Sequence, residues 1–471
     1  MTDLIESTLR RLGGQLPGRT SRPGEERYAA ATAIWAKPIG LMPRMVVHCR
    51  TMADIQLAIA AARSAGLALS VRGSGHDWAG RALCDGLVLD LSGMRDVQVS
   101  PDRRSARISG GARAVGVLAA TDPLGLAAVT GSCSAVGMAG LTLGGGYGPS
   151  LDNLIAADIV LADGRIVTAE PGNEEDLFWA LRGGGGNFGV VAEMRIRLHE
   201  LPNVVSGVLV YPFSEARTVL RRFAELAPSL PDELTVQVCA VAGPDGAPLI
   251  LLVPTWSGRQ GGGDAPIAPL LKLGTLLDNS VDAVRYGASL SVFDPFIVNG
   301  QRVFMETCSL PALIEDATEI IVEAMAKAIS AGCAILTHEF RGAASRVPVE
   351  ATAFGLRRDH VLIEILASFP DRSDRLEERR HQHWARDTRR AFGRIALPGG
   401  YPNLLGPGET DRAAENFGPN AERLAMVKRH YDPGKVFSSA IPLPPDHGPT
   451  ATEQPASLHR QARSAAPNSR V

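Results

Sequence analysis

The chain is organised around the stretch Gly131–Gly148, GSCSAVGMAGLTLGGGYG. Seven of its eighteen residues are glycine, and Cys133 lies near its start. Glycine lets backbone N–H groups approach a ligand closely, and consecutive amides form a concavity that suits anionic oxygens. We therefore predict that this stretch lies against a large anionic ligand, with Cys133 facing it. It is not a nucleotide P-loop, because no Gly-Lys-Ser/Thr sequence follows.

Two more glycine-bearing segments flank this stretch. The first, Arg72–Asp77 (RGSGHD), follows a strand predicted over 67–72. The second, Gly183–Gly189 (GGGGNFG), follows a short helix for which Asn173 is the predicted N-cap, and it precedes a strand predicted over 190–198. The order helix, glycines, strand is wrong for a Rossmann turn, in which the glycines follow a strand and open a helix.

Composition narrows the class of protein. The 471 residues suffice for two domains, and the net charge of −2 gives no electrostatic reason to expect nucleic acid or an anionic membrane as partner. No run approaches the roughly 18 apolar residues that span a bilayer, and the N-terminus lacks a secretory signal pattern. We therefore expect a cytoplasmic protein. The six cysteines have no metal-ligand spacing, so we predict buried free thiols and no metal site.

Elements can be predicted along both halves of the chain. The first 50 residues are interpreted as an N-terminal arm with one short strand, and Thr51 with Asp54 forms a capping box for a helix that Gly66 ends. Asp163-Gly164 between apolar runs indicates a hairpin. The sequence texture changes near Leu201-Pro202. Beyond it, predicted helices alternate with strands, over 214–227, 235–240, 312–330 and 361–368.

Five separated motifs resemble the berberine-bridge-enzyme-like branch of the vanillyl-alcohol-oxidase superfamily, flavoproteins with a PCMH-type FAD domain. The likeness covers nearly all of residues 35–441. The motifs are RGSGH at 72–76, GSCSAVG at 131–137, LRGGGGNFG at 181–189, YPN at 401–403, and NFGPN at 416–420 with the following RL and YDP at 423–433.

The resemblance implies an α+β fold in two domains. A PCMH-type FAD-binding domain with two α/β subdomains would occupy 1–201. A substrate domain, an antiparallel sheet backed by helices whose face roofs the flavin, would occupy 202–398. Residues 399–442 would return to the FAD domain, and 443–471 is predicted to be a disordered tail because it is rich in Pro, Ser and Ala.

The cofactor implied by the resemblance is FAD, bonded covalently to both His76 and Cys133. Without the family context, a lone histidine after glycines is more often a hydrogen-bonded loop residue than a cofactor ligand, and a free cysteine is usually an inert buried thiol. The predicted cofactor-binding residues lie in the glycine loops and around the YPN motif: Arg72, Gly73, Ser74, Gly75, His76, Asp77, Ser132, Cys133, Val136, Gly137, Gly140, Gly144, Gly145, Tyr147, Gly148, Val190, Tyr401 and Asn403.

Two residues are candidates for the catalytic base. The resemblance points to Tyr401, whose phenol pKa near 10 would have to be lowered by a neighbouring positive charge; otherwise it packs on the flavin or holds Asn403. Glu364 matches a polar position on the substrate-facing strand, and as a lone acid among apolar neighbours it faces either water or the flavin. His338 and Glu339, on another candidate strand, are expected to face solvent.

The resemblance implies an oxidoreductase that removes a hydride from a hydroxyl- or amine-bearing carbon of a sugar or natural-product intermediate and reduces O2 to H2O2. The alternatives are a dehydrogenase with another acceptor, a flavin-dependent cyclase or synthase in secondary metabolism, and a non-catalytic binding module. The chain departs from relatives that carry a histidine at Leu141 or near Leu356 and an aromatic residue at Leu404, so the substrate stays open.

Overall fold

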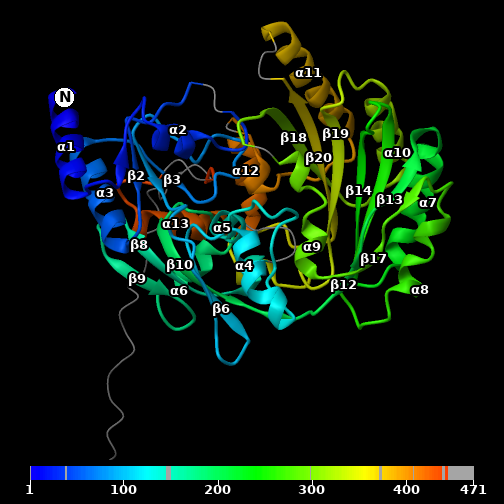
Figure 1. The fold of residues 1–471 in the computed structure, drawn as a ribbon, viewed down its shortest axis with the longest axis horizontal. Helices are drawn as coiled ribbons and strands as arrows, with labels where there is room; N and C mark the ends of the chain where they lie inside the picture. Colours follow the sequence, from blue (N-terminus) through cyan, green and yellow to red (C-terminus); the bar gives the residue numbers. More distant parts are fainter. Residues whose placement is uncertain are drawn as a thin grey trace, which may run out of the picture.

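The computed structural model describes residues 2–37, 40–144, 150–297, 299–370, 374–406, 408–437 and 441–443. In these residues the strands form three sheets and one two-stranded pair, with helices on their outer faces (Figure 1). The mixture of helices with largely antiparallel sheets confirms the predicted α+β class.

The first sheet, in the order β1-β2-β4-β3, lies at the N-terminal end of the molecule. Strands β2, β3 and β4 run parallel, and β1 pairs antiparallel with β2. Helices α1 (Thr2–Gln15) and α3 (Met52–Ala65) bury apolar faces in the core beside this sheet. The strands are β1 (Thr20–Ser21), β2 (Met45–His48), β3 (Leu69–Arg72) and β4 (Leu87–Asp90).

Local signals predict part of this region well. The capping box of Thr51 and Asp54 is present at the start of α3, and Gly66 ends the helix in the left-handed region at φ +61°. The predicted N-terminal arm is wrong, because residues 2–32 contain α1 and α2 (Glu26–Thr32) besides β1. The N-cap residue of α2, Glu25, makes no side-chain capping hydrogen bond. Helix α1 is stabilised by tertiary packing of buried residues such as Leu9 and Leu12.

The second sheet is antiparallel, in the order β5-β6-β10-β8-β9. The Asp163-Gly164 turn joins β8 and β9 as predicted, with Gly164 at φ +89°. Asn173 does not cap the next helix: its side chain donates to the Thr168 carbonyl, and Glu174 occupies the cap position of α6 (Glu175–Leu181). The strands are β5 (Val97–Val99), β6 (Ser105–Ser109), β8 (Leu154–Leu161), β9 (Ile166–Ala169) and β10 (Gly189–Arg197).

The third sheet contains the strands between residues 204 and 369, all antiparallel. Its main path is β16-β13-β15-β14-β19-β20-β18, and β12 pairs with β15 and β17. The strands are β12 (Val204–Ser206), β13 (Leu209–Pro212), β14 (Leu234–Ala242), β15 (Pro248–Trp256), β16 (Asp278–Asn279), β17 (Asp282–Val284), β18 (Arg302–Leu310), β19 (Cys333–Phe340) and β20 (His360–Phe369).

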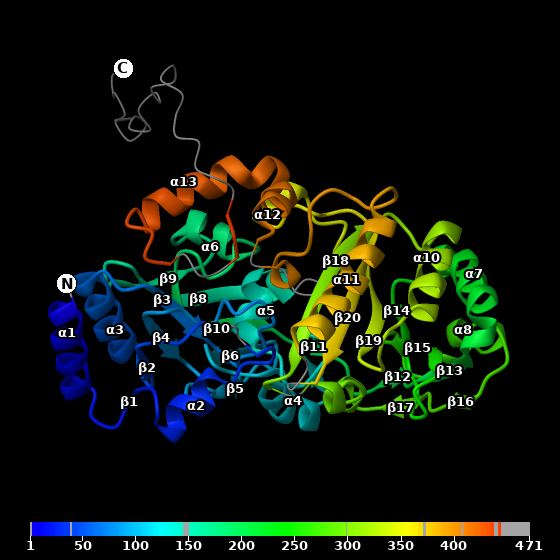
Figure 2. The same ribbon diagram turned by 90° about the horizontal axis from the view of Figure 1, so that it is seen from above.

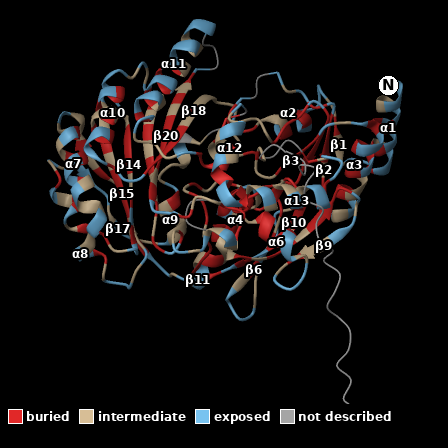
Figure 3. Cartoon of the chain, turned by 180° about the vertical axis from the view of Figure 1, so that it is seen from behind, coloured by how far each residue is buried: buried red, intermediate tan, exposed pale blue. Residues whose placement is uncertain are grey.

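One face of the third sheet is covered by three amphipathic helices, α7 (Ala216–Leu226), α10 (Glu315–Ala326) and α11 (Arg375–Phe392). Alternation along β20 sends Ile363 and Ile365 into this helix-packed core and leaves Glu364 on the other face. Figure 3 shows the buried residues following the sheets, with the exposed ones on the outer sides of the helices.

The last described helices lie back over the N-terminal half. Helix α13 (Ala421–Tyr431) lies over α6 (Figure 2), and its Leu424 and Tyr431 share a core with α6; helix α12 (Thr410–Phe417) precedes it. The remaining elements are the pair β7 (Leu126–Ala127) and β11 (His199–Glu200), and helices α4 (Ala114–Thr121), α5 (Met138–Gly144), α8 (Asp264–Ile267) and α9 (Tyr286–Leu290). None of the described helices has the length and apolarity needed to cross a membrane.

Candidate active site

A cavity of about 600 Å3 lies between the glycine loops and the free face of the third sheet. Fourteen of the predicted site residues line it: Gly73, Ser74, Gly75, His76, Asp77, Ser132, Cys133, Val136, Gly137, Gly140, Val190, Glu364, Tyr401 and Asn403. Gly145, Tyr147 and Gly148 lie outside the described residues, as do residues 444–471 of the predicted tail. Arg72 and Gly144 support the cavity from behind its lining.

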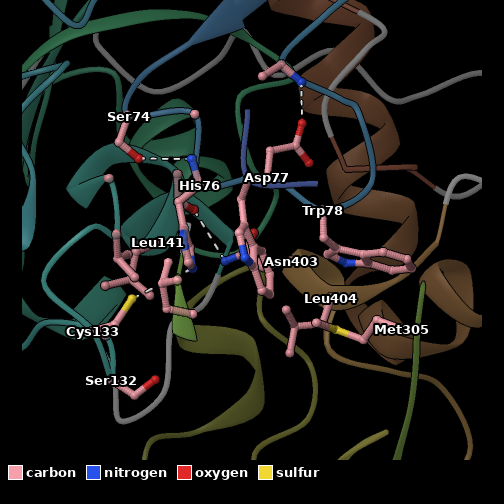
Figure 4. A pocket seen from close by; sticks show the side chains of 18 of the residues that line it. Ser74, His76, Asp77, Trp78, Ser132, Cys133, Leu141, Met305, Asn403 and Leu404 are labelled. Atoms are coloured by element: carbon pink, nitrogen blue, oxygen red, sulfur yellow. Dashed lines mark hydrogen bonds between the residues drawn. The ribbon is translucent and has the colours of Figure 1, made fainter. Parts of the chain in front are cut away.

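His76 and Cys133 point toward one another across the cavity wall (Figure 4), with His76 Nε2 3.9 Å from Cys133 Sγ. The ring of His76 stacks on Trp35 at a centroid distance of 4.9 Å and an interplanar angle of 9°. Its Nδ1 is buried, and no protein group described in the structure hydrogen-bonds to it. A buried ring nitrogen without a protein partner is what a site for a bound group would present.

Burial keeps both of these side chains uncharged. It lowers the pKa of His76 to about 4, against a smaller opposing effect from the charge of Glu364. It raises the pKa of the Cys133 thiol to about 11, although the Ala135 and Val136 amides favour the thiolate. At neutral pH the imidazole is therefore a neutral nucleophile and the thiol keeps its proton.

The loops of residues 73–77 and 131–137 contact each other at a position that has no room for a side chain. A Cβ on Gly137 would lie 2.8 Å from Ser74 Oγ, so residue 137 has to be glycine for loops 73–77 and 131–137 to meet. Ser74 Oγ accepts a hydrogen bond from the His76 amide at 3.2 Å. Asp77 ends the first loop by accepting from the Ala79 and Ala82 amides at 2.9 and 2.7 Å. These contacts fix the backbone on which His76 stands.

Arg72, which was predicted to bind the cofactor, is not among the described residues that line the cavity. Its guanidinium donates to Asp90 at 2.9 Å behind the loop, 3.0 Å from where a Cβ of Gly75 would lie. Asp90 also binds His48 at 3.1 Å. Burial opposes ionisation of Asp90, but the His48 hydrogen bond and the Arg72 charge together lower its pKa. Arg72 therefore supports the loop, because its side chain lies outside the cavity lining.

The segment 401–405 closes one end of the cavity. Asn403 Nδ2 donates to Tyr401 Oη at 3.0 Å and to the Gly140 carbonyl at 3.3 Å. A Cβ on Gly144 would lie 1.9 Å from Asn403 Oδ1, so the contact requires glycine there. Arg81, which the sequence did not single out, donates to the Pro402 and Leu405 carbonyls at 3.0 and 2.6 Å.

Tyr401 does not meet the condition for a base at neutral pH. Its side chain is 7% exposed, and burial raises the pKa of the phenol above its usual value of 10. The hydrogen bond from Asn403 lowers that pKa by less than burial raises it, and the negative charge of Glu364 adds to the increase. The effect runs opposite to the lowering that the sequence interpretation required.

Glu364 lies on the cavity face of β20 and pairs with His338 from β19, with 3.2 Å between Oε1 and Nε2. Both side chains are about one-tenth exposed. The expectation that His338 faces solvent is wrong: in the register of β19 and β20, Leu336 pairs with Glu364 and His338 with Leu362, so His338 lies diagonal to Glu364 on the same face. Gln237 of β14 lies 3.4 Å from His338 Nε2. The strand register that brings these residues together cannot be predicted from the local sequence.

The expectation for Glu339 is also corrected. Its carboxylate accepts from the Val236 amide at 3.1 Å and lies 3.6 Å from the Arg341 guanidinium, with the side chain 10% exposed. The six cysteines, in contrast, are all buried and unpaired as predicted.

Comparison with known proteins agrees with this geometry. Residues 43–170 match the FAD binding domain family, and residues 400–444 match the family described as berberine and berberine like. The chain is 28% identical over 437 residues to the FAD-linked oxidoreductase aurO of Gibberella zeae, covering 87% of this chain and 82% of that protein. It is 27% identical to (R)-6-hydroxynicotine oxidase of Paenarthrobacter nicotinovorans, covering 92% and 97%.

Solved structures show the same fold. The crystal structure of 6-hydroxy-D-nicotine oxidase from Arthrobacter nicotinovorans superposes with a TM-score of 0.81 at 26% identity, over 90% of this chain and 97% of that one. Xylooligosaccharide oxidase from Myceliophthora thermophila shares the fold with a TM-score of 0.80 at 23% identity, over 94% and 99%. The two matched families are those that the sequence motifs resemble, and the relatives above are named FAD-linked oxidoreductases or oxidases.

Proposed function

We propose that this protein is an FAD-dependent oxidase that removes a hydride from a hydroxyl- or amine-bearing carbon of a small molecule and passes the electrons to O2, giving H2O2. The observation that carries the proposal is the placement of His76 and Cys133 in one wall of the cavity that Glu364 enters from the third sheet. The relatives named as oxidases support this reaction class.

The described residues suit FAD. The two loops present glycine backbone to the cavity. The neutral ring of His76 has a buried Nδ1 to which no described protein group hydrogen-bonds. We propose covalent attachment through His76 and Cys133, with the remaining predicted cofactor-binding residues that line the cavity around the flavin. Each attachment would replace a C–H bond of the flavin and the N–H or S–H bond of the side chain, and O2 would take up the two electrons and two protons released, giving H2O2. Bound FAD supplies the hydride acceptor and the route to O2.

Glu364 is the proposed base. As a carboxylate it would take the proton from the substrate hydroxyl or amine while the hydride leaves the same carbon. His338, 3.2 Å away, would orient the carboxylate and stabilise its charge. Tyr401 and Asn403 would position the substrate by hydrogen bonding, because the raised pKa of Tyr401 disfavours its phenolate.

We also propose that residues 1–201 form the FAD-binding domain and residues 202–398 the substrate domain. Residues 399–442 would return to the FAD-binding domain.

Anaerobic mixing with substrate followed by admission of air tests this function. The proposal predicts loss of the oxidised flavin absorbance, then rapid return in air with one H2O2 for each substrate oxidised. Slow return in air with rapid return on an artificial acceptor would identify a dehydrogenase instead. Turnover without peroxide or acceptor consumption would identify an isomerising synthase.

A further inference from the structure

The part of the cavity formed by the third sheet has an apolar wall with one ionisable cluster. The wall consists of Cys239, Val241, Leu251, Met305, Leu336 and Leu366. Strand pairing places these side chains next to one another, because Leu336 faces Cys239 and Glu364, and Leu366 faces Met305. Met305 and Leu404 lie close together at the side of Trp78 (Figure 4).

Hydrogen-bonding groups on this wall are concentrated at Gln237, His338 and Glu364. The next polar residue along β20 that lines the cavity is Ser368, four residues and roughly 13 Å from Glu364 at about 3.3 Å per residue. A sugar ring presents hydroxyl groups on all sides, and each would need a partner once buried. Along β20 the described wall offers such partners at Glu364 and again at Ser368, with Leu366 between them.

The charged residues that line the cavity also restrict the charge of the substrate. Arg81 is the sole Lys or Arg among the described lining residues, and its guanidinium already donates to the Pro402 and Leu405 carbonyls. An anionic substrate would therefore enter an apolar cavity that holds Glu364 without gaining a cation. Asp77, the other lining carboxylate, is held by two backbone amides.

We infer that the substrate is a neutral or cationic, largely apolar molecule with a single hydroxyl or amine at the reacting carbon, rather than a sugar or a carboxylic acid. This inference rests on the proposed function for the identity of the reacting group. The apolar body would lie on the wall around Leu336 and Leu366, and the polar group would meet Glu364 and His338.

Calorimetric titration of the flavin-loaded protein, kept free of O2 and with its flavin reduced beforehand, tests the inference without turnover. The probes are benzyl alcohol, 2-phenylethanol, 3-phenylpropan-1-ol, 3-phenylpropan-1-amine, 3-phenylpropanoate, glucose and cellobiose. We expect Kd to fall about fourfold for each added CH2 of the alcohols, as burial of apolar surface requires. The amine should bind at least as tightly as its alcohol and the carboxylate at least tenfold more weakly. Both sugars should bind at least 100-fold more weakly than 3-phenylpropan-1-ol.

A matched pair of variants locates the binding. Leu366→Ala should weaken 3-phenylpropan-1-ol about tenfold, whereas Ile363→Val on the helix-packed face of the same strand should leave its Kd unchanged. A sugar or 3-phenylpropanoate that binds as tightly as 3-phenylpropan-1-ol, a Kd that ignores chain length, or equal effects of both variants would overturn the inference. Flavin reduction is measured separately: if binding follows the expected order but no alcohol or amine reduces the flavin, the proposed function fails and the inferred apolar binding site stands.

Discussion

Gly144 and Asn403 are packed so closely that adding one methyl group to Gly144 should push Asn403 away. In Gly144→Ala the new Cβ would lie 1.9 Å from Asn403 Oδ1, so Asn403 must move and lose its hydrogen bond to Tyr401. We expect kcat to fall at least tenfold while FAD content is retained. The control is Gly116→Ala in α4, where a Cβ meets nothing within 4 Å and the helix should gain up to about 1 kcal/mol. Equal activity of the two variants would contradict the proposed role of Asn403.

The two attachment residues should differ in their pH dependence. The pKa of His76 is lowered to about 4, so its nucleophilic neutral form is complete across pH 7–9. The pKa of Cys133 is raised to about 11, so its thiolate fraction rises tenfold with each pH unit in that range. FAD added to apo-protein should therefore attach to Cys133→Ala at a pH-independent rate and to His76→Ala at a rate that rises with pH. The rates can be followed by the mass of the intact protein, and reversed pH dependences would show that the environments are wrongly assigned.

At the scale of elements, the pairing of β19 with β20 brings the proposed base, Glu364, next to His338. Glu364→Gln keeps the shape of the side chain but removes the base, so we expect the rate of anaerobic flavin reduction to fall by about 10²–10⁴. His338→Gln should reduce the rate less and alter its pH profile, because His338 acts through Glu364. Stopped-flow absorbance measures both. If Glu364→Gln is fully active and Tyr401→Phe is inactive, Tyr401 is the base.

Arg81, which lies four residues beyond the loop of residues 73–77, connects this part of the chain to the segment that carries Tyr401 and Asn403. Arg81→Met would leave the Pro402 and Leu405 carbonyls without these donors, at a cost of about 1–3 kcal/mol for each that stays buried. Denaturant unfolding should show this loss, and kcat should fall because the segment is no longer held. Arg165→Met, which removes an exposed pair with Asp163, is the control and should leave the unfolding midpoint unchanged, because exposed ion pairs contribute little to stability.

Short-range patterns predicted the elements that depend on neighbouring residues. The capping box at Thr51, the Asp163-Gly164 hairpin and the glycine loops follow from such patterns, and fourteen predicted residues meet at one cavity. The positions of His338, Arg81 and Trp35 depend on strand register and on contacts between distant segments. Local sequence patterns therefore could not predict these positions. Alternation shows that Glu364 differs from its neighbours, but it cannot say which face of the sheet is covered.

At the scale of the whole molecule, the cavity lies where three parts of the chain meet. The loops of residues 73–77 and 131–137 form one wall, the third sheet forms another, and the 401–405 segment closes the end. An isolated bridge between Leu69 and Phe437 also connects the end of the segment 408–437 to the first sheet. In the proposed function each part has one role: the loops attach the cofactor, the third sheet supplies the base, and the 401–405 segment positions the substrate.

The most direct measurement of the central claim is acid denaturation of purified protein followed by absorbance spectroscopy and peptide mapping. We predict that the yellow chromophore stays with the precipitated chain and maps to both His76 and Cys133. Cys133→Ala should retain flavin attached through His76 alone. Flavin that washes free of the native sequence on denaturation, or a chain purified with no flavin, would contradict the account.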